Sequence, residues 1–373
     1  MIFLKPLAYA GLIAKVVDCY TANVPLETRS LDEIYQAAQN EDGNLVVAWG
    51  GDAGPQGNAV RNAWKARFPN ITLDLSVDLS KYHDSRIDRA WYNKNETVDI
   101  ATLQTLHDFK RWKQQDRLMY YKPANFDDLY NGEKDLDGAF LPMGMYNFGN
   151  FLYDSTKLNA SQVPKTYADL LNPFWKSKLV LTYPNDDDAI NYLFTLIVSK
   201  YGFEWLDALA KQDVQWVRGT ATPSYIIVDN HLNTTSSAAI ACSAGSPQGR
   251  ILSFTSAGYP AGPAPFLHST APLAPEQTIS WAQTTAAFSS TKRPQSAKLF
   301  LSWITSGEWQ HGGGAGFSPL RSLDMGRVMV GNGTQSSGFR LFVGDRVGVE
   351  WWKLQFEMVI GNPLGPGPME MFP

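Results

Sequence analysis

The chain has 373 residues, which is long enough for two domains with ordinary hydrophobic cores. Its 44% hydrophobic and 18% charged residues are typical of a globular protein and exclude a disordered one. A net charge of -4 excludes general attraction to nucleic acid, and two cysteines are too few for a thiolate zinc site. We therefore expect a soluble protein of two domains with no nucleic-acid partner.

The N-terminus has the pattern of a secretion signal. Residues 1–17 are apolar with Lys5 near the front, and small residues follow. We therefore expect residues 1–22 to be a signal peptide. No other stretch reaches the ~18 apolar residues that span a bilayer, so we expect no membrane insertion. Glycosylation sequons, more than the roughly two or three expected by chance, also favour secretion: Asn70, Asn95, Asn159, Asn233 and Asn332.

The first third of the chain alternates strand and helix patterns. Ser30 and Glu33 form a capping-box pattern, which predicts the start of a helix. The segments that follow have the apolar periods of buried strands and amphipathic helices. The expected strands are 44–50, 70–79 and 96–105, and the expected helices are 30–40, 55–68 and 106–115.

The same alternation returns in the middle of the chain. Residues 176–202 and 213–232 each predict a strand, a polar turn and a helix, and residues 236–246 predict a short strand. Residues 259–277 contain five prolines and predict a connection between domains. Beyond this connection, the apolar spacing predicts amphipathic helices at 293–310 and 347–361.

This alternation predicts the fold class and the position of a ligand site. Strands that alternate with helices indicate an α/β protein with parallel sheets and helices on both faces. In such sheets, ligands bind where the strands end, against the N-termini of helices. The polar turns in which we expect function are 50–54, 104–105, 184–188, 218–224 and 243–246.

A cluster of glycines follows the first predicted strand in "VVAWGGDAGPQG". Gly51, Gly54 and Gly57 do not have the G-x-G-x-x-G spacing of a dinucleotide site, and no lysine follows as in a phosphate-binding P-loop. The loop therefore predicts a strand-to-helix turn whose free N–H groups suit an anionic or strongly polar group. A plain turn and a ligand contact remain equal alternatives.

Ser243 lies in "ACSAG", which nearly matches the nucleophile elbow of serine hydrolases. His268 or His311, with Asp324, could supply the other catalytic groups. The residues after Gly245 do not begin the helix that an elbow requires. A serine that hydrogen-bonds a ligand or the backbone is therefore favoured, and a hydrolase remains the alternative.

Two further polar turns carry charges. The run from Asp186 to Asp188 lacks the alternation and the central glycine of a calcium loop, so helix-capping carboxylates are favoured over a metal site. Arg218 offers a planar fork for a carboxylate or phosphate, and hydroxyls at Thr220, Thr222 and Ser224 follow at a helix start. The alternative for this segment is a capped helix with an exposed arginine.

Taken in order, these segments resemble the type 2 periplasmic (extracellular) solute-binding proteins, and among them the ferric-iron and related group of ABC-transport binding proteins. The resemblance extends from about residue 30 to about residue 325. Its single motifs are loose, but their order is fairly specific. The matching stretches are "SLDEIYQAAQNEDGNLVVAWGG", "VDIATLQT", "VPKTYADLLNPFWKSKLVLTYP", "DVQWVRG", "ISWAQTTAAF", "SAKLFLSWITSGEWQ" and "GFSPLRSLD".

The resemblance implies two Rossmann-like α/β lobes, joined by two crossing strands, with a ligand cleft between them. Lobe one is expected at 30–145 plus 265–373, and lobe two at 146–264. The hinge is expected near 141–154 and in the proline-rich stretch. The residues expected to contact the ligand are Gly51, Asp52, Gln104, Thr105, Tyr146, Asn185, Asp186, Arg218, Thr220, Ser224, Tyr225, Ser243 and Trp281.

The chain departs from the ferric members, which carry adjacent tyrosines in lobe two as iron ligands. The adjacent pair here, Tyr120 and Tyr121, falls in lobe one, and Tyr225 stands alone. Ferric iron is therefore a less favoured ligand, and we expect neither a metal site nor a cofactor. Other members bind thiamine, phosphonates or phosphorylated sugars, so a phosphorylated or carboxylated organic solute is favoured.

These expectations describe a secreted, monomeric binding protein that captures a small polar or anionic solute and makes or breaks no bond. In a bacterium its partner would be a membrane permease. The sequons instead suggest a eukaryotic, perhaps fungal, homologue that needs no importer. The alternatives are a secreted serine hydrolase that uses Ser243 and a glycosylated surface or effector protein with a vestigial cleft.

Overall fold

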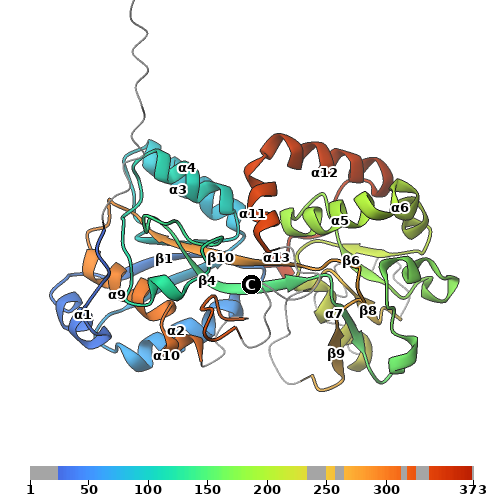
Figure 1. The fold of residues 1–373 in the computed structure, drawn as a ribbon, viewed down its shortest axis with the longest axis horizontal. Coiled ribbons are helices and arrows are strands. Elements are labelled where there is room, and N and C mark those ends of the chain that lie inside the picture. Colours follow the sequence, from blue (N-terminus) through green and yellow to red (C-terminus); the bar gives the residue numbers. More distant parts are fainter. Residues whose placement is uncertain (1–23, 233–248, 257–263, 312–316, 325–335, 372–373) are drawn as a thin grey trace, which may run out of the picture.

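The computed structural model describes residues 24–232, 249–256, 264–311, 317–324 and 336–371. Figure 1 shows two α/β lobes side by side, with strands that run from one lobe into the other. This arrangement confirms the predicted α/β class and the two lobes.

Lobe one is built around a five-stranded sheet with the order β2-β1-β3-β10-β4. β1 pairs in parallel with β2 and β3, whereas β10 is antiparallel to β3 and β4. β3 and β10 are buried along their whole length, because helices cover both faces of the sheet. The strands are β1 (Leu45–Gly50), β2 (Leu73–Asp78), β3 (Ile100–Leu103), β4 (Leu141–Phe148) and β10 (Ile279–Ala287).

The helices of lobe one divide between two hydrophobic clusters. Trp64 and Trp303 belong to one cluster, whereas Ile87 and Trp112 belong to the other. The helices of the first cluster are α1 (Leu31–Ala38), α2 (Asn58–Arg67), α9 (Pro294–Ile304) and α10 (Gly307–Gln310), and those of the second are α3 (Ser80–Tyr92) and α4 (Leu106–Gln114). The single helix expected at 293–310 is thus two helices, because Ser306 caps a new one by accepting the N–H of Trp309.

Lobe two contains two smaller sheets. β5 (Phe151–Asp154) lies between β8 (Leu252–Ser253) and β9 (Leu267–Thr270) and is antiparallel to both. β6 (Val180–Thr182) and β7 (Gln215–Val217) pair in parallel. Three helices complete this part of the lobe: α5 (Asp188–Tyr201), α6 (Phe203–Ala210) and α7 (Thr222–Leu232).

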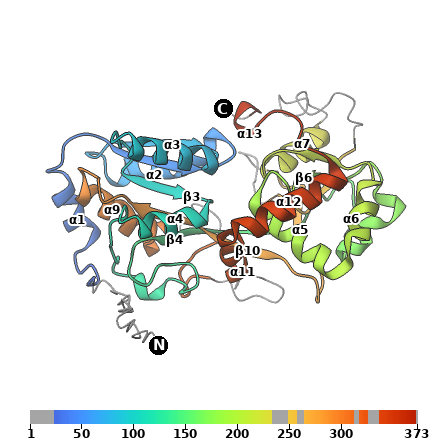
Figure 2. The same ribbon diagram turned by 90° about the horizontal axis from the view of Figure 1, so that it is seen from above.

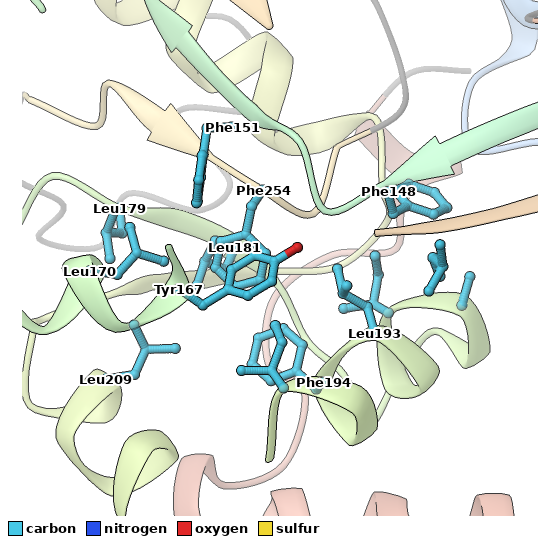
Figure 3. Close-up of a cluster of buried hydrophobic side chains, with 14 of the residues drawn as sticks. Phe148, Phe151, Tyr167, Leu170, Leu179, Leu181, Leu193, Phe194, Leu209 and Phe254 are labelled. Atoms are coloured by element: carbon cyan, nitrogen blue, oxygen red, sulfur yellow. The ribbon is translucent and has the colours of Figure 1, made fainter. Parts of the chain in front are cut away.

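The core of lobe two is rich in aromatic side chains. Figure 3 shows Tyr167 packed among Phe151, Phe194 and Phe254, with its hydroxyl group on the side of Phe148. That hydroxyl lies 3.0 Å from the carbonyl oxygens of both Gly149 and Gln277, which share its single hydrogen. Gly149 follows β4 and Gln277 precedes β10, so one buried tyrosine ties both crossing strands to the core of lobe two.

β4 lies in one segment where the resemblance places the hinge, and β10 begins just after the proline-rich stretch that is the other. β4 and β10 pair from Leu141 opposite Thr285 to Phe148 opposite Ile279. In lobe two, residues 149–150 connect β4 to β5, and residues 271–278 connect β9 to β10. Figure 1 shows both strands passing between the lobes at the centre of the molecule.

The C-terminal helices differ from the expected domain boundary. They are α11 (Ser336–Gly344), α12 (Arg346–Ile360) and α13 (Pro368–Met371). We expected them in lobe one, but α12 packs against α5 and α6, and Phe339, Val343 and Phe356 belong to the core of lobe two. Figure 2 shows α12 lying over lobe two. β9 also belongs to lobe two, because it pairs with β5.

α11 makes contact with both lobes. It packs against α4 and β10 as well as against α5. Arg340 donates to the buried Glu133 carboxylate at 3.0 Å and to Thr284 Oγ1 at 2.8 Å, both in lobe one. Its neighbours Phe339 and Val343 lie in the core of lobe two. Figures 1 and 2 both place α11 at the junction of the lobes.

Candidate ligand-binding site between the lobes

A cavity of about 270 Å³ lies where the two lobes meet. Both lobes and the C-terminal helices contribute to its walls. The predicted ligand residues that line it are Gly51, Asp52, Gln104, Thr105, Asn185, Asp186 and Trp281. Their role in binding stays a prediction. Most of them lie in loops at the ends of strands, where ligands bind in α/β sheets, and these loops meet at one cavity.

The lobe-one wall is formed by the loops that follow parallel strands. The N–H of Gly51 donates to the Asp78 carbonyl at the end of β2, and the N–H of Gln104 donates to Ser80 Oγ at 2.9 Å. A Cβ on Gly50 would lie 2.1 Å from Ser80 Oγ, so only glycine permits this close approach. The glycine-rich loop is therefore at least a tight structural turn.

The lobe-two wall carries three consecutive aspartates whose carboxylates are all engaged. Asp187 caps α5 by accepting the N–H groups of Ala189 and Ile190, as the sequence predicted. Asp186 accepts from Arg218 at 2.9 Å, and Asp188 accepts from Lys353 at 2.9 Å and Arg346 at 2.5 Å. The wall is thus built of ion pairs and a helix cap.

Burial and ion pairing act in opposite directions on these carboxylates. Burial raises the pKa of Asp186, but the hydrogen bond from Arg218 and the charge of Lys81 outweigh it and lower the pKa below its usual value. Lys353 and Arg346 have the same effect on the pKa of Asp188. Burial, together with the charges of the neighbouring Asp52, Asp188 and Asp186, raises the pKa of Asp187 to about 7. Asp186 and Asp188 are therefore ionised at neutral pH.

Four residues on the cavity walls hold a buried polar atom with no hydrogen-bond partner among the described residues. They come from both lobes, and their atoms have little contact with water. Buried polar groups are nearly always paired, so each such atom needs an explanation. The atoms are Thr105 Oγ1, His107 Nδ1, Asn185 Oδ1 and Trp281 Nε1.

Trp281 is held firmly in the junction. Its ring stacks on Tyr146 with centroids 5.3 Å apart and packs against Phe339. The hydroxyl of Tyr146 donates to Gln283 Oε1 at 3.1 Å, and Gln283 in turn donates to the Gly50 carbonyl at 2.8 Å. Tyr146 thus supports the wall through Trp281 and Gln283.

Other predicted ligand residues are engaged inside the protein. Arg218 binds Asp186, and Thr220 donates to Asp52. Ser224 is buried and donates to the Ala221 carbonyl, while Tyr225 is half-buried and has a partner. None of these four is among the residues that line the cavity.

Some predictions fall outside the described residues. They include the signal peptide, Ser243, Asn233 and Asn332. Asn70, Asn95 and Asn159 are exposed, as glycosylation would require. Two of the catalytic partners considered for a hydrolase lie in different lobes. Asp324 accepts from Tyr130 in lobe one, whereas His268 lies on β9 in lobe two, so they do not support the hydrolase alternative.

Sequence reasoning missed several residues of the cavity wall. Ser80 and Lys81 follow β2, so the rule that located the other loops could have found them. His107 lies in the first turn of α4, the helix after β3. The sequence did not predict a place on the cavity wall for Arg346, Lys353 or Pro368, because their segment was expected in lobe one. Asp187, Asp188 and Gly219 fall in the expected polar turns but were not named as ligand residues. The remaining wall residues that were missed are Leu79, Asp84, Ala189 and Phe339.

A larger cavity, of about 590 Å³, lies within lobe one. Its walls include Ile87 and Trp91 of α3 and Phe288 after β10. It contains none of the predicted ligand residues and is not shared between the lobes. The interlobe cavity is therefore the candidate site.

Within the described ranges, no group of three or more His, Cys, Asp or Glu side chains is arranged to hold a metal ion. The adjacent tyrosines 120 and 121 do not line the cavity, and the Tyr121 hydroxyl lies 2.7 Å from Ser302 Oγ in lobe one. None of the described helices is long and apolar enough to cross a bilayer.

Residues 95–230 match the sequence family described as bacterial extracellular solute-binding proteins. No curated protein sequence is similar enough to count as a relative. Among solved structures, the substrate-binding protein of an ABC transporter from Agrobacterium tumefaciens has a TM-score of 0.66 at 13% identity. That comparison covers 86% of this chain and 95% of the other.

Two other solved structures have bound ligands. AfuA from Actinobacillus pleuropneumoniae, with fructose-6-phosphate bound, has a TM-score of 0.58 at 14% identity over 86% of this chain and 99% of its own. Iron-bound HitA from Pseudomonas aeruginosa has a TM-score of 0.56 at 12% identity over 84% of this chain and 99% of its own. The predicted resemblance is confirmed: residues 95–230 have the sequence pattern of the bacterial extracellular solute-binding proteins, and the described chain has the two-lobed fold of the periplasmic ones.

Proposed function

We propose that this protein captures a small polar or anionic solute in the interlobe cavity and leaves it chemically unchanged. The observation that carries this proposal is the set of four unpartnered polar atoms on the cavity walls. A buried polar group without a partner costs about 1–3 kcal/mol, so four together are an appreciable burden on the empty protein. A solute that pairs with them removes this cost.

The four atoms also specify what kind of solute fits. Trp281 Nε1 is a donor, Asn185 Oδ1 is an acceptor, and the Thr105 hydroxyl can act as either. Burial lowers the pKa of His107, so its ring is neutral and can also donate or accept. A solute with several hydroxyl, amide or amine groups meets this mixture of requirements.

Both lobes supply these atoms, so binding is coupled to the relative position of the lobes. Thr105 and His107 come from lobe one, Asn185 comes from lobe two, and Trp281 lies on a crossing strand. A solute that contacts all of them stabilises the closed arrangement. The structural neighbour that holds fructose-6-phosphate supports an organic solute, whereas iron has no matching group of His, Cys, Asp and Glu ligands among the described residues.

The family model supports a location outside the cytoplasm. We propose that the protein acts there as a monomer, and that in a bacterium it delivers its solute to a membrane permease. Removal of residues 1–22, glycosylation and a eukaryotic origin belong to the same proposal and rest on the sequence alone. No described residue favours a hydrolase.

Native mass spectrometry of the protein as purified, combined with metal analysis, tests the proposal. We expect a small organic solute at one molecule per chain. Trp281→Phe keeps an aromatic ring but lacks the unpartnered N–H, so the variant should lose solute while keeping its fold. Trp205→Phe is the control, because Trp205 Nε1 already donates to Tyr167 O away from the cavity. Equal solute retention in all three proteins, or no solute in any, would contradict the proposal.

A further inference from the structure

Besides the crossing strands and α11, a buried carboxylate of lobe one contacts the loop before α7 in lobe two. Asp52 Oδ2, in the loop after β1, accepts the N–H of Thr220 at 2.6 Å, the Thr220 hydroxyl at 2.8 Å and the N–H of Ala221 at 3.3 Å. Thr220 and Ala221 immediately precede α7 in lobe two. Asp52 and Thr220 are each 8% exposed, so the contact is closed to water.

This arrangement is the recognition of an anion. The first turn of a helix presents free N–H groups and the positive end of the helix dipole, which favour a negatively charged group. Hydrogen bonds to an ionised acceptor are stronger than those between neutral groups. At α7 the negatively charged group belongs to the other lobe of the same chain.

The loop of lobe one is shaped to deliver this carboxylate. Gln56 Oε1 accepts the N–H groups of Asp52 and Ala53, at 2.7 and 3.3 Å, and fixes the turn. On the other side, Gly219 has a φ of +79° and lies against Pro368, where a Cβ would come within 2.6 Å. Gln56 therefore fixes the lobe-one loop, and the close approach of Gly219 and Pro368 fixes the turn before α7.

We infer that Asp52 occupies the anion-binding position of lobe two, where it latches the lobes together and excludes a solute's phosphate or carboxylate group. Asp52 and Gly219 both line the solute cavity, so this position is a corner of the candidate site. The solute is then held by the neutral groups of the cavity, and any charged group of the solute lies away from α7. The solute part of this inference rests on the proposed function, whereas the latch does not.

The one ion pair that the described residues form between the lobe-one loops and the 186–188 wall is weaker than the Asp52 contact. Lys81 Nζ lies 3.3 Å from Asp186 Oδ1, but the lysine side chain is 45% exposed. Exposed pairs of this kind contribute little and are screened by salt. The buried Asp52 contact is therefore expected to dominate the closure of these loops on lobe two.

Small-angle X-ray scattering of Asp52→Ala, together with titration calorimetry using inorganic phosphate, tests the inference. We expect the variant to have a larger radius of gyration than the native protein. It should also bind phosphate at least about tenfold more tightly, because the vacated N–H groups accept a new anion. Asp345→Ala is the matched control, since Asp345 caps α12 by accepting the N–H of Gly348 within one lobe.

The outcomes separate the latch, the exclusion and the proposed function. An unchanged radius of gyration in Asp52→Ala would refute the latch, and equal phosphate affinity in both proteins would refute the exclusion. Neither readout needs the solute, so its absence in mass spectrometry counts against the proposed function alone. If Asp52→Ala fails to fold, Thr220→Val removes one donor and leaves the carboxylate. It should then enlarge the radius of gyration in part, and no enlargement would overturn the latch.

Discussion

The two walls of the interlobe cavity use the same kinds of side chains in opposite ways. On the lobe-two wall, Asp186 and Asp188 are each paired with cations, which lower their pKa. On the lobe-one wall, Asp84 faces no such partner, and burial together with the neighbouring charge of Asp108 raises its pKa to about 7. Thr105 and His107 on that wall each have an unpartnered polar atom.

This difference separates side chains that stabilise the protein from side chains that select the solute. Paired groups hold the protein together, because their hydrogen bonds are already satisfied in the absence of solute. Unpartnered groups discriminate between solutes, because a solute that fails to pair with them leaves a buried polar atom unsatisfied. Changes to the cation-paired Asp186 and Asp188 of the lobe-two wall should therefore alter stability first. Changes to Asp84, Thr105 and His107 of the lobe-one wall should alter affinity or pH dependence.

The largest effect is expected from Asp84→Asn. With a folded pKa of about 7, well above the ordinary value, native Asp84 keeps a proton that the unfolded chain has lost. Its contribution to stability is therefore present below pH 4 and is lost as the pH rises through about 7. Removing it should raise the free energy of unfolding at pH 8 relative to pH 5 by about 2–3 kcal/mol, at about 1.4 kcal/mol per pH unit.

Urea denaturation at pH 5, 6, 7 and 8 measures this change in slope. Asp74→Asn is the control, because Asp74 is an exposed aspartate on β2 outside the cavity. If Asp84→Asn and the native protein show parallel pH curves, the two walls do not differ in the charge of their carboxyl groups.

The next effect is expected from Asp188→Ala. It leaves Arg346 and Lys353 without their shared carboxylate, and hydrogen bonds to charged groups contribute about 1.5–3 kcal/mol. We expect a loss of about 2 kcal/mol in urea denaturation. Glu350→Ala is the control, since Glu350 contacts the same two cations but is 61% exposed and should cost much less. An intact stability with abolished solute binding would reverse the roles of the two walls.

A smaller effect is expected from Thr105→Val, which replaces the unpartnered hydroxyl with a methyl group of the same shape. The affinity for the solute identified in the purified protein should fall about tenfold, or about 1.4 kcal/mol, while the thermal midpoint stays unchanged. Titration calorimetry measures the affinity. Thr195→Val, in which the lost hydroxyl already donates to the Asn191 carbonyl, should leave affinity unchanged. The opposite result, lost stability with intact affinity, would place Thr105 among the structural groups.

The smallest effect is expected from Lys81→Gln, which removes the exposed ion pair to Asp186. The loss of stability should stay below about 1 kcal/mol and should vanish in high salt. Thermal unfolding at low and high ionic strength tests this, with the exposed Lys65→Gln as a comparison. A large loss that persists in salt would show that this contact, and not only Asp52, closes the lobes.

The sequence predicted most elements of lobe one and two of its loops that reach the cavity, those after β1 and β3. The reason is local: the alternation of apolar residues defines β1 and β3, and ligand loops follow the ends of parallel strands, which located Gly51, Gln104 and Thr105. The same rule located Asn185 and Asp186 in lobe two.

The partners of these residues were not predictable in the same way. Arg218 was expected to bind a ligand, but it binds Asp186, because the pairing depends on how two separate turns pack. The apolar positions of α12, such as Val349 and Phe356, predict a buried face but not the lobe that buries it. The positions of Arg346 and Lys353 on the cavity wall therefore could not be predicted from the sequence.

The way in which α11 joins the lobes has a consequence for the rate of solute exchange. Arg340 fixes this helix to Glu133 of lobe one, while Phe339 and Val343 fix it to lobe two. A rotation of the lobes must therefore either detach the helix from one core or separate a buried ion pair, and separating such a pair is strongly unfavourable. We expect the solute to dissociate slowly, at the rate of this detachment and not of diffusion, and to remain with the protein through dialysis.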